Sequence, residues 1–256
     1  MKWIRILGLY FEKVFEYKAK SLLWIFIPMA NNLTLLLFWK GATEQMNYIS
    51  TYYILMTVGG LFLTSYIEDD VAEVDIKQGE LVNYLTKPIS YYWMKLFIEI
   101  PYRVMQAIYA ALIIGIFIVF FRFNLSLVLR PLYIPLIFII FTLGYLISFT
   151  FKMSIAYLSF WFKDMHGFYE LTTIIAIIFS GSVMPLEWYP PIMRSMAHIL
   201  PFAYSSYYPI MTLIKPFEFI DFLTIICIQS VWLCILLVFH NFLWKQGIKE
   251  FTAVGQ

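Results

Sequence analysis

An almost uninterrupted apolar run from Pro131 to Phe162 constrains the fold of this chain more than any other feature. Lys152 is the only charged residue within it. At about 1.5 Å per residue, a helix of this length is longer than the roughly 30 Å hydrocarbon core of a bilayer. We therefore expect a membrane helix that tilts, bends near Gly144 or projects beyond the membrane.

The composition extends this conclusion to the whole chain. Hydrophobic residues make up 62% and charged residues 13% of the sequence, and the mean hydropathy is +0.77. These values lie far outside the range of a soluble domain. No polar interval is long enough to bury a core of its own, so we predict one membrane domain over residues 1–256. The net charge of only +2 gives no reason to expect nucleic acid as a partner.

The apolar segments predict an all-α membrane protein with six transmembrane helices. The predicted spans cover about residues 22–39, 49–67, 100–121, 131–162, 168–183 and 219–244. Residues 1–21 precede them and predict an amphipathic helix in the membrane interface, although a solvated basic tail is the alternative. The apolar residues of this helix recur at steps of three and four, namely Trp3, Ile6, Leu7, Tyr10, Val14 and Tyr17.

A charge-rich insertion, residues 68–95, separates the second and third spans. Six acidic residues lie between Glu68 and Glu80, and an apolar stripe accompanies them. Such a segment suits the membrane surface or a soluble partner better than the bilayer core. Gly79 allows a bend between two short helices, and Lys87-Pro88 marks a stop before the chain re-enters the membrane. We interpret the insertion as a docking element.

A second broken segment, residues 184–216, lies between the fifth and sixth spans. Its six prolines each interrupt or start a helix, and tyrosines and tryptophan are frequent between them. This pattern predicts a hairpin of short re-entrant or interfacial helices with aromatic side chains at headgroup depth.

The positions of lysine and arginine predict the orientation of the six spans. Eleven of these residues fall on the side that carries both termini and residues 68–95, and five fall on the opposite side. Because basic residues concentrate in cytoplasmic loops, we expect both termini and the docking element in the cytoplasm. The hairpin of residues 184–216 is then extracellular.

The sequence has none of the common catalytic motifs. It contains no G-x-x-x-x-G-K-[ST] phosphate loop, no H-E-x-x-H and no G-x-S-x-G. His166, His198 and His240 are widely separated and have no carboxylate at ligand spacing, so we expect no metal site. We therefore expect no enzyme activity and no cofactor in this chain, and any work driven by ATP must come from another subunit.

Some polar residues within the predicted spans are candidates for lining a path. Amides and charges at this depth should face other helices or water, because lipid offers them no partner. Lys152 could bind an anionic substrate group, pair with a carboxylate on another helix, or extend to the cytoplasmic interface. Glu99 and Arg103, one turn apart, can pair with each other. The candidates are Asn31, Asn32, Tyr52, Tyr53 and Lys152.

The order of these features resembles the ABC-2 type permeases, the membrane subunits of ABC exporters. The loop Asp75-Ile76-Lys77-Gln78-Gly79-Glu80-Leu81, with Leu85 and Lys87-Pro88, is similar to that family's I-x-x-G-x-L and L-x-x-P segment. Further similarities to a bacterial branch of the family are Phe160-Trp161-Phe162-Lys163-Asp164, Ser180-Gly181 with Pro185-Leu186, and Pro201-Phe202 with Tyr208-Pro209. The resemblance covers nearly the whole chain.

The resemblance implies an exporter of two permeases and two ATPase subunits in the bacterial cytoplasmic membrane. ATP and magnesium would bind to the ATPase, and the second permease would be an identical chain or a paralogue. Residues 68–95 would hold a coupling helix that contacts the ATPase, and the resemblance assigns this role to Asp75, Ile76, Gly79, Glu80, Leu81 and Leu85. The cargo stays open among lipids, peptides, glycans and drugs.

Other classes of membrane protein would show different features. An ion-gradient secondary transporter should carry several acids within its spans. A lipid-modifying enzyme needs acids, histidines or a nucleophile on one face, and we find no such set. A membrane scaffold would show no change that depends on nucleotide.

Overall fold

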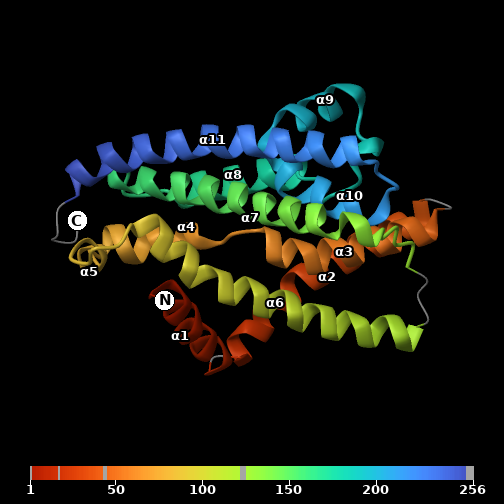
Figure 1. Cartoon of the computed structure of the whole chain (residues 1–256), viewed down its shortest axis with the longest axis horizontal. Helices are drawn as coiled ribbons and strands as arrows, with labels where there is room; N and C mark the ends of the chain where they lie inside the picture. The colour runs from red at the N-terminus through yellow and green to blue at the C-terminus, as the bar shows by residue number, and fades with distance from the viewer. Residues whose placement is uncertain (1, 17, 43–44, 122–124, 252–256) are drawn as a thin grey trace.

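The computed structural model describes residues 2–16, 18–42, 45–121 and 125–251, and every regular element in these ranges is helical (Figure 1). The elements up to the third long helix are α1 (Lys2–Glu16), α2 (Lys18–Ala42), α3 (Met46–Leu63), α4 (Ile67–Asp69), the π-helix η1 (Asp70–Lys77), α5 (Val82–Leu85) and α6 (Tyr91–Phe121). The remaining elements are η2 (Pro131–Tyr133), α7 (Ile134–Ala156), η3 (Tyr157–Phe160), α8 (His166–Phe179), η4 (Leu186–Trp188), α9 (Pro191–Ile199), the π-helix η5 (Ala203–Tyr207), α10 (Tyr208–Ile214) and α11 (Phe219–Glu250).

Three helical segments in the described part of the chain are long and apolar enough to cross a membrane. They are Tyr91–Ile116, Pro131–Phe160 and Phe219–Glu250. Two further apolar helices, Ile25–Trp39 and α8, are shorter than that. The prediction of an all-helical, multi-pass membrane protein is confirmed, whereas the count of six spans stays a prediction.

The long helices lie roughly along one axis of the molecule (Figure 1). α7 and α11 pack against each other along much of their length, and α3 packs on both α2 and α6. α1 lies across α6 near the lower edge of the view. Tyr169 is the one buried residue of α8, so most of this helix lies at the surface of the described structure.

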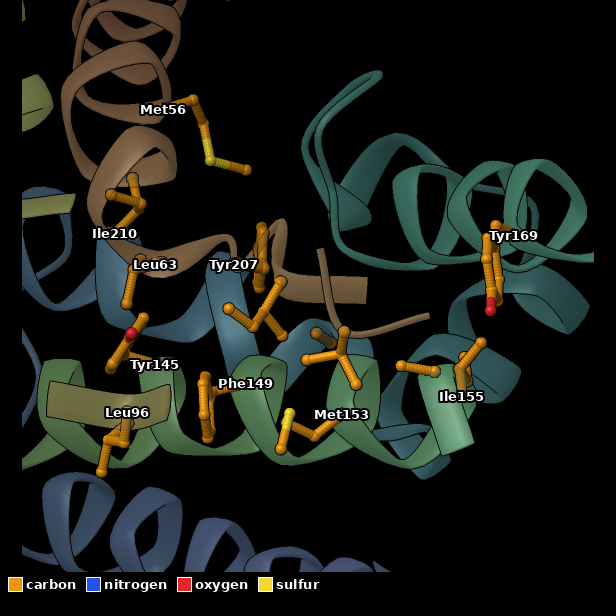
Figure 2. Close-up of a cluster of buried hydrophobic side chains, with 14 of the residues drawn as sticks. Met56, Leu63, Leu96, Tyr145, Phe149, Met153, Ile155, Tyr169, Tyr207 and Ile210 are labelled. Atoms are coloured by element: carbon orange, nitrogen blue, oxygen red, sulfur yellow. The ribbon is translucent and has the colours of Figure 1, made fainter. Parts of the chain in front are cut away.

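Most of the large buried side chains form one core between these helices. Figure 2 shows Tyr145, Phe149 and Met153 in order along α7, with Leu63 of α3 and Ile210 of α10 near Tyr145. The segment formed by η5 and α10 is therefore part of the core. Two features place it there, a glycine on α7 and a glutamine on α11.

The glycine is Gly144, where a Cβ atom would lie only 2.9 Å from the backbone oxygen of Ser205. The absence of a side chain thus allows η5 to approach α7, in the region where we expected a bend. The glutamine is Gln229 of α11, whose Nε2 donates to the backbone oxygens of Ile140 (3.0 Å) and Tyr204 (2.8 Å). These contacts join α7, η5 and α11.

Two predicted boundaries differ from the structure. α2 begins at Lys18, inside the predicted interfacial helix of residues 1–21, and α1 ends at Glu16. α6 begins at Tyr91, before the end of the predicted loop of residues 68–95 and well before residue 100. The early start of α6 has a physical reason, because the charged side chains of Lys95 and Glu99 find buried partners and do not need water.

Candidate functional site

The insertion between α3 and α6 folds across one end of the helix bundle, called here the α5 end. α4, α5 and the C-terminal end of α11 all lie at this end (Figure 1). After η1 the chain turns at Gly79, which has a φ of 83°, a conformation that glycine adopts readily. α5 follows this turn, so the predicted bend at Gly79 is observed.

The residues predicted to contact an ATPase divide between two faces of this insertion. Asp75, Ile76 and Leu81 point into the protein and are buried. Glu80 and Leu85 are exposed, and the exposed fraction of Leu85 is 45%. We call the exposed set the docking surface, and it consists of Glu80, Val82, Asn83, Leu85 and Lys87.

The inner face is fixed to α6 by a buried ion pair. Lys95 is only 2% exposed, and its Nζ lies 2.5 Å from Asp75 Oδ2 and 2.7 Å from Asp70 Oδ2. The Tyr91 hydroxyl also donates a hydrogen bond to Asp75. Burial raises the pKa of Asp75 above its usual value, and the positive charge of Lys95 opposes this increase. Removal of Lys95 would leave the charge of Asp75 buried without a counter-charge, whereas Lys95 would keep Asp70 as a partner if Asp75 were removed.

A second buried pair connects α4 to α7. Lys152 Nζ is bonded to Glu68 Oε1 and lies 2.9 Å from Thr173 Oγ1 of α8. Both charged side chains are buried, and burial raises the pKa of Glu68, with Lys152 acting in the opposite direction. Of the alternatives that the sequence left open for Lys152, the structure shows pairing with a carboxylate on another helix.

A third polar cluster joins α6, α7 and the segment between α3 and α4 through the carboxylate of Glu99. It accepts hydrogen bonds from Ser65 Oγ (2.8 Å), Tyr66 N (3.0 Å), Tyr145 Oη (3.0 Å) and Arg103 Nε (3.0 Å). The pair of Glu99 and Arg103 was expected from their spacing and is confirmed. The contacts from Ser65, Tyr66 and Tyr145 were not predicted, because no periodicity relates residues so far apart in the chain.

The predicted path-lining residues do not form one group in this structure. Asn31 is exposed, and Asn32 Nδ2 donates to Thr57 Oγ1 at 3.0 Å. Tyr52 and Tyr53 are buried and donate to the backbone oxygens of Gly181 (2.5 Å) and Val183 (2.6 Å). Lys152 lies apart from these residues, where it pairs with Glu68 of α4.

The two tyrosines hold the turn that follows α8, which we call the α8 turn (residues 180–183). Trp39 Nε1 of α2 also donates to Val183 O, at 3.3 Å. Gly181 has a φ of 77°, and this positive angle allows its carbonyl to face Tyr52. The start of the predicted hairpin is thereby tied to α2 and α3.

A comparison of the sequence with known protein families gives a match. A sequence profile described as "ABC-2 family transporter protein" matches residues 31–255. The chain belongs to the ABC-2 transporter family. No curated protein matches the sequence. The matched range includes the docking surface, all three polar clusters and the α8 turn, whereas α1 precedes it.

Membership in the ABC-2 transporter family gives the general role of this chain and the class of its partners. An ABC-2 transporter is a multi-pass membrane protein with a permease role, and the family implies association with ABC ATPase partners. In the described ranges of this ABC-2 transporter, no three histidine, cysteine or acidic side chains are grouped so that they could hold a metal ion. The His166 side chain lies 3.3 Å from the carboxylate of Glu170, and both side chains are exposed.

Proposed function

We propose that this ABC-2 protein is the permease subunit of an exporter and is driven by separate ATPase subunits that bind ATP and magnesium. The observation that carries the proposal is the two-sided insertion at the α5 end. Its outer side presents Leu85 and Val82 to solvent, and its inner side is joined to α6 and α7 by buried ion pairs. An ATPase bound to the outer side would therefore act directly on two membrane helices.

The buried pairs suit the transmission of a movement. Breaking a buried ion pair by removing one charge costs about 3–5 kcal/mol, so a displaced insertion would move α6 and α7 with it. Rigid-body movement of helices is a common way in which a binding event changes access at a distant site. In this account, Asp75 and Leu81 hold the insertion in place, while Glu80 and Leu85 contact the ATPase.

The proposal includes six spans with both termini in the cytoplasm of a bacterial cell. The unequal distribution of lysine and arginine supports this orientation. It places the docking surface in the cytoplasm with the ATPase, and the α8 turn with the hairpin of residues 184–216 on the extracellular side. A second permease, identical or paralogous, would complete the path for the cargo.

The experiment that tests the proposal is retention of an ATPase subunit by the purified protein in nanodiscs. Leu85→Asp places a charge on the docking surface without disturbing the core, because Leu85 is exposed. We expect the native protein to retain a subunit with a nucleotide phosphate loop, identified by mass spectrometry, and Leu85→Asp to lose most of it.

Leu127→Asp is the matched control, because Leu127 is also an exposed leucine in a connecting segment, but it lies outside the docking surface. This variant should retain the subunit as the native protein does. If the native protein retains no such subunit, or if Leu85→Asp retains it fully, the docking assignment is wrong. A membrane scaffold would then be the better account.

A further inference from the structure

The α5 end also has a pocket beside the docking surface. It has a cavity volume of about 80 Å³ and lies where η1, η3 and the end of α11 meet. Three stretches that are distant in the sequence line it, namely Ile76 and Lys77, Ser159 with Phe160 and Lys163, and Glu250 with Phe251.

Of the lining residues, Ile76, Ser159 and Phe160 are buried, and the three charged residues are more exposed. The rings of Phe160 and Phe251 meet edge to face, with their centroids 6.2 Å apart. Phe160 packs closely against α11 at Gly247, where a Cβ atom would overlap the phenylalanine ring. Lys163 and Glu250 are exposed and have no ion-pair partner among the described residues, while Lys77 pairs with Glu73 at 2.6 Å. Such a lining suits an apolar group with charged neighbours.

The docking surface alone is small for a stable protein contact. Specific complexes bury about 800 Å² on each partner. α5 has only four residues, and Val82 and Leu85 are its exposed apolar side chains. The contact must therefore extend beyond α5. η1 connects the two areas, because it precedes the docking surface and contributes Ile76 and Lys77 to the pocket.

We infer that this pocket accepts one apolar side chain of the ATPase subunit, as a second part of the same interface. The volume is well above that of one water and below the roughly 150 Å³ of a cavity that holds benzene, so one aliphatic side chain fits. In the ATPase subunit, the segment that carries this side chain also has an acidic residue that lies against Lys163 and a basic residue that lies against Glu250. The inference rests on the proposed function and adds a second contact to it.

The first test is photo-crosslinking within the intact complex in cells. A photoreactive amino acid replaces Lys163, Leu85 or Leu127 in separate variants. We expect Lys163 and Leu85 positions to form adducts whose peptides come from the subunit with the phosphate loop, and the Leu127 position to form none. An adduct at Leu85 without one at Lys163 would overturn the pocket inference and leave the proposed function intact. Absence of both adducts would contradict the proposed function itself.

The second test measures affinity of the purified permease in nanodiscs for that ATPase subunit. Lys163→Glu should weaken binding roughly tenfold, whereas Lys163→Arg should bind as the native protein does. Phe251→Ala removes one wall of the pocket and should also weaken binding several-fold. Unchanged affinity in both Lys163→Glu and Phe251→Ala would overturn the inference, even if Leu85→Asp abolishes binding.

Discussion

Lys152 illustrates how much a single buried charge determines in this protein. It is only 5% exposed and lies within the apolar run of residues 131–162, and its charge is balanced by Glu68. A buried lysine without a counter-charge would be strongly destabilising. The pair also joins α4 to α7. A substitution at either residue should therefore change the free energy of unfolding.

Replacing Lys152 with methionine should lower the free energy of unfolding by about 3–5 kcal/mol, because Glu68 would remain charged and buried without a partner. Thermal unfolding in detergent measures this loss. The double variant Glu68→Gln with Lys152→Met should recover much of the stability, since no charge is then left unpaired. Strictly additive losses in the double variant would show that the two side chains do not depend on each other.

Gly247 provides a second prediction at this scale. A Cβ atom there would lie 2.2 Å from Cδ2 of Phe160, so Gly247→Ala should destabilise the protein by about 1–3 kcal/mol through overpacking. Gly60→Ala is the matched control in another helix, because a Cβ atom at Gly60 meets nothing within 4 Å. Alanine stabilises a helix by up to about 1 kcal/mol relative to glycine, so this control should be neutral or stabilising. Equal melting temperatures for the two variants would contradict the close packing of α11 on η3.

The sequence was sufficient to single out some of the buried polar residues, but their partners could not be predicted from it. The interest of Lys152 was evident from one charge in an apolar run, and the pair of Glu99 and Arg103 followed from helical spacing. The partner of Lys152 could not be predicted, because Glu68 lies on another element and only tertiary packing joins them. For the same reason, Tyr52 and Tyr53 could be recognised as polar residues in a span, but their contacts with the α8 turn could not.

At the scale of elements, the α8 turn is a connection that side chains of other helices hold in place. Its carbonyls accept hydrogen bonds from α2 and α3 rather than from within a helix. Tyr52→Phe would leave the buried oxygen of Gly181 without this partner, at a cost of about 1–2 kcal/mol. Hydrogen exchange in residues 180–189 should therefore become about 5-fold to 30-fold faster.

Tyr109→Phe is the comparison for this experiment. Tyr109 is a partly buried tyrosine of α6, distant from the α8 turn. It should leave exchange in residues 180–189 unchanged. If Tyr52→Phe also leaves that exchange unchanged, the tyrosine does not hold the turn.

The ends of elements were harder to predict than their presence. The bend at Gly79 and the helix breaks at the prolines of residues 184–216 follow from the backbone preferences of single residues. The start of α6 does not, because the charge-rich loop was predicted to extend to Lys95 and the span to begin at about residue 100. Asp75 on η1 and Ser65 in the segment after α3 allow the charges of Lys95 and Glu99 to lie inside a helix.

At the scale of the whole molecule, the apolar runs were sufficient to predict an all-helical membrane protein, and the order of motifs was sufficient to suggest its family. We propose that an ATPase acts on the membrane helices through the docking surface. This claim predicts that a change at Leu85 affects hydrolysis of ATP by another subunit, although this chain has no phosphate loop of its own.

The most direct measurement is the ATPase rate of the assembled complex in nanodiscs, compared between the native protein, Leu85→Asp and Leu127→Asp at equal amounts of permease. We expect the rate of ATP hydrolysis per permease to be about tenfold lower for Leu85→Asp than for the native protein. If the loss reflects weaker binding of the ATPase, a tenfold change corresponds to about 1.4 kcal/mol of binding free energy. Leu127→Asp should keep the native rate. Equal rates for all three proteins would contradict the account, because the docking surface would then have no part in the connection between the ATPase and the membrane helices.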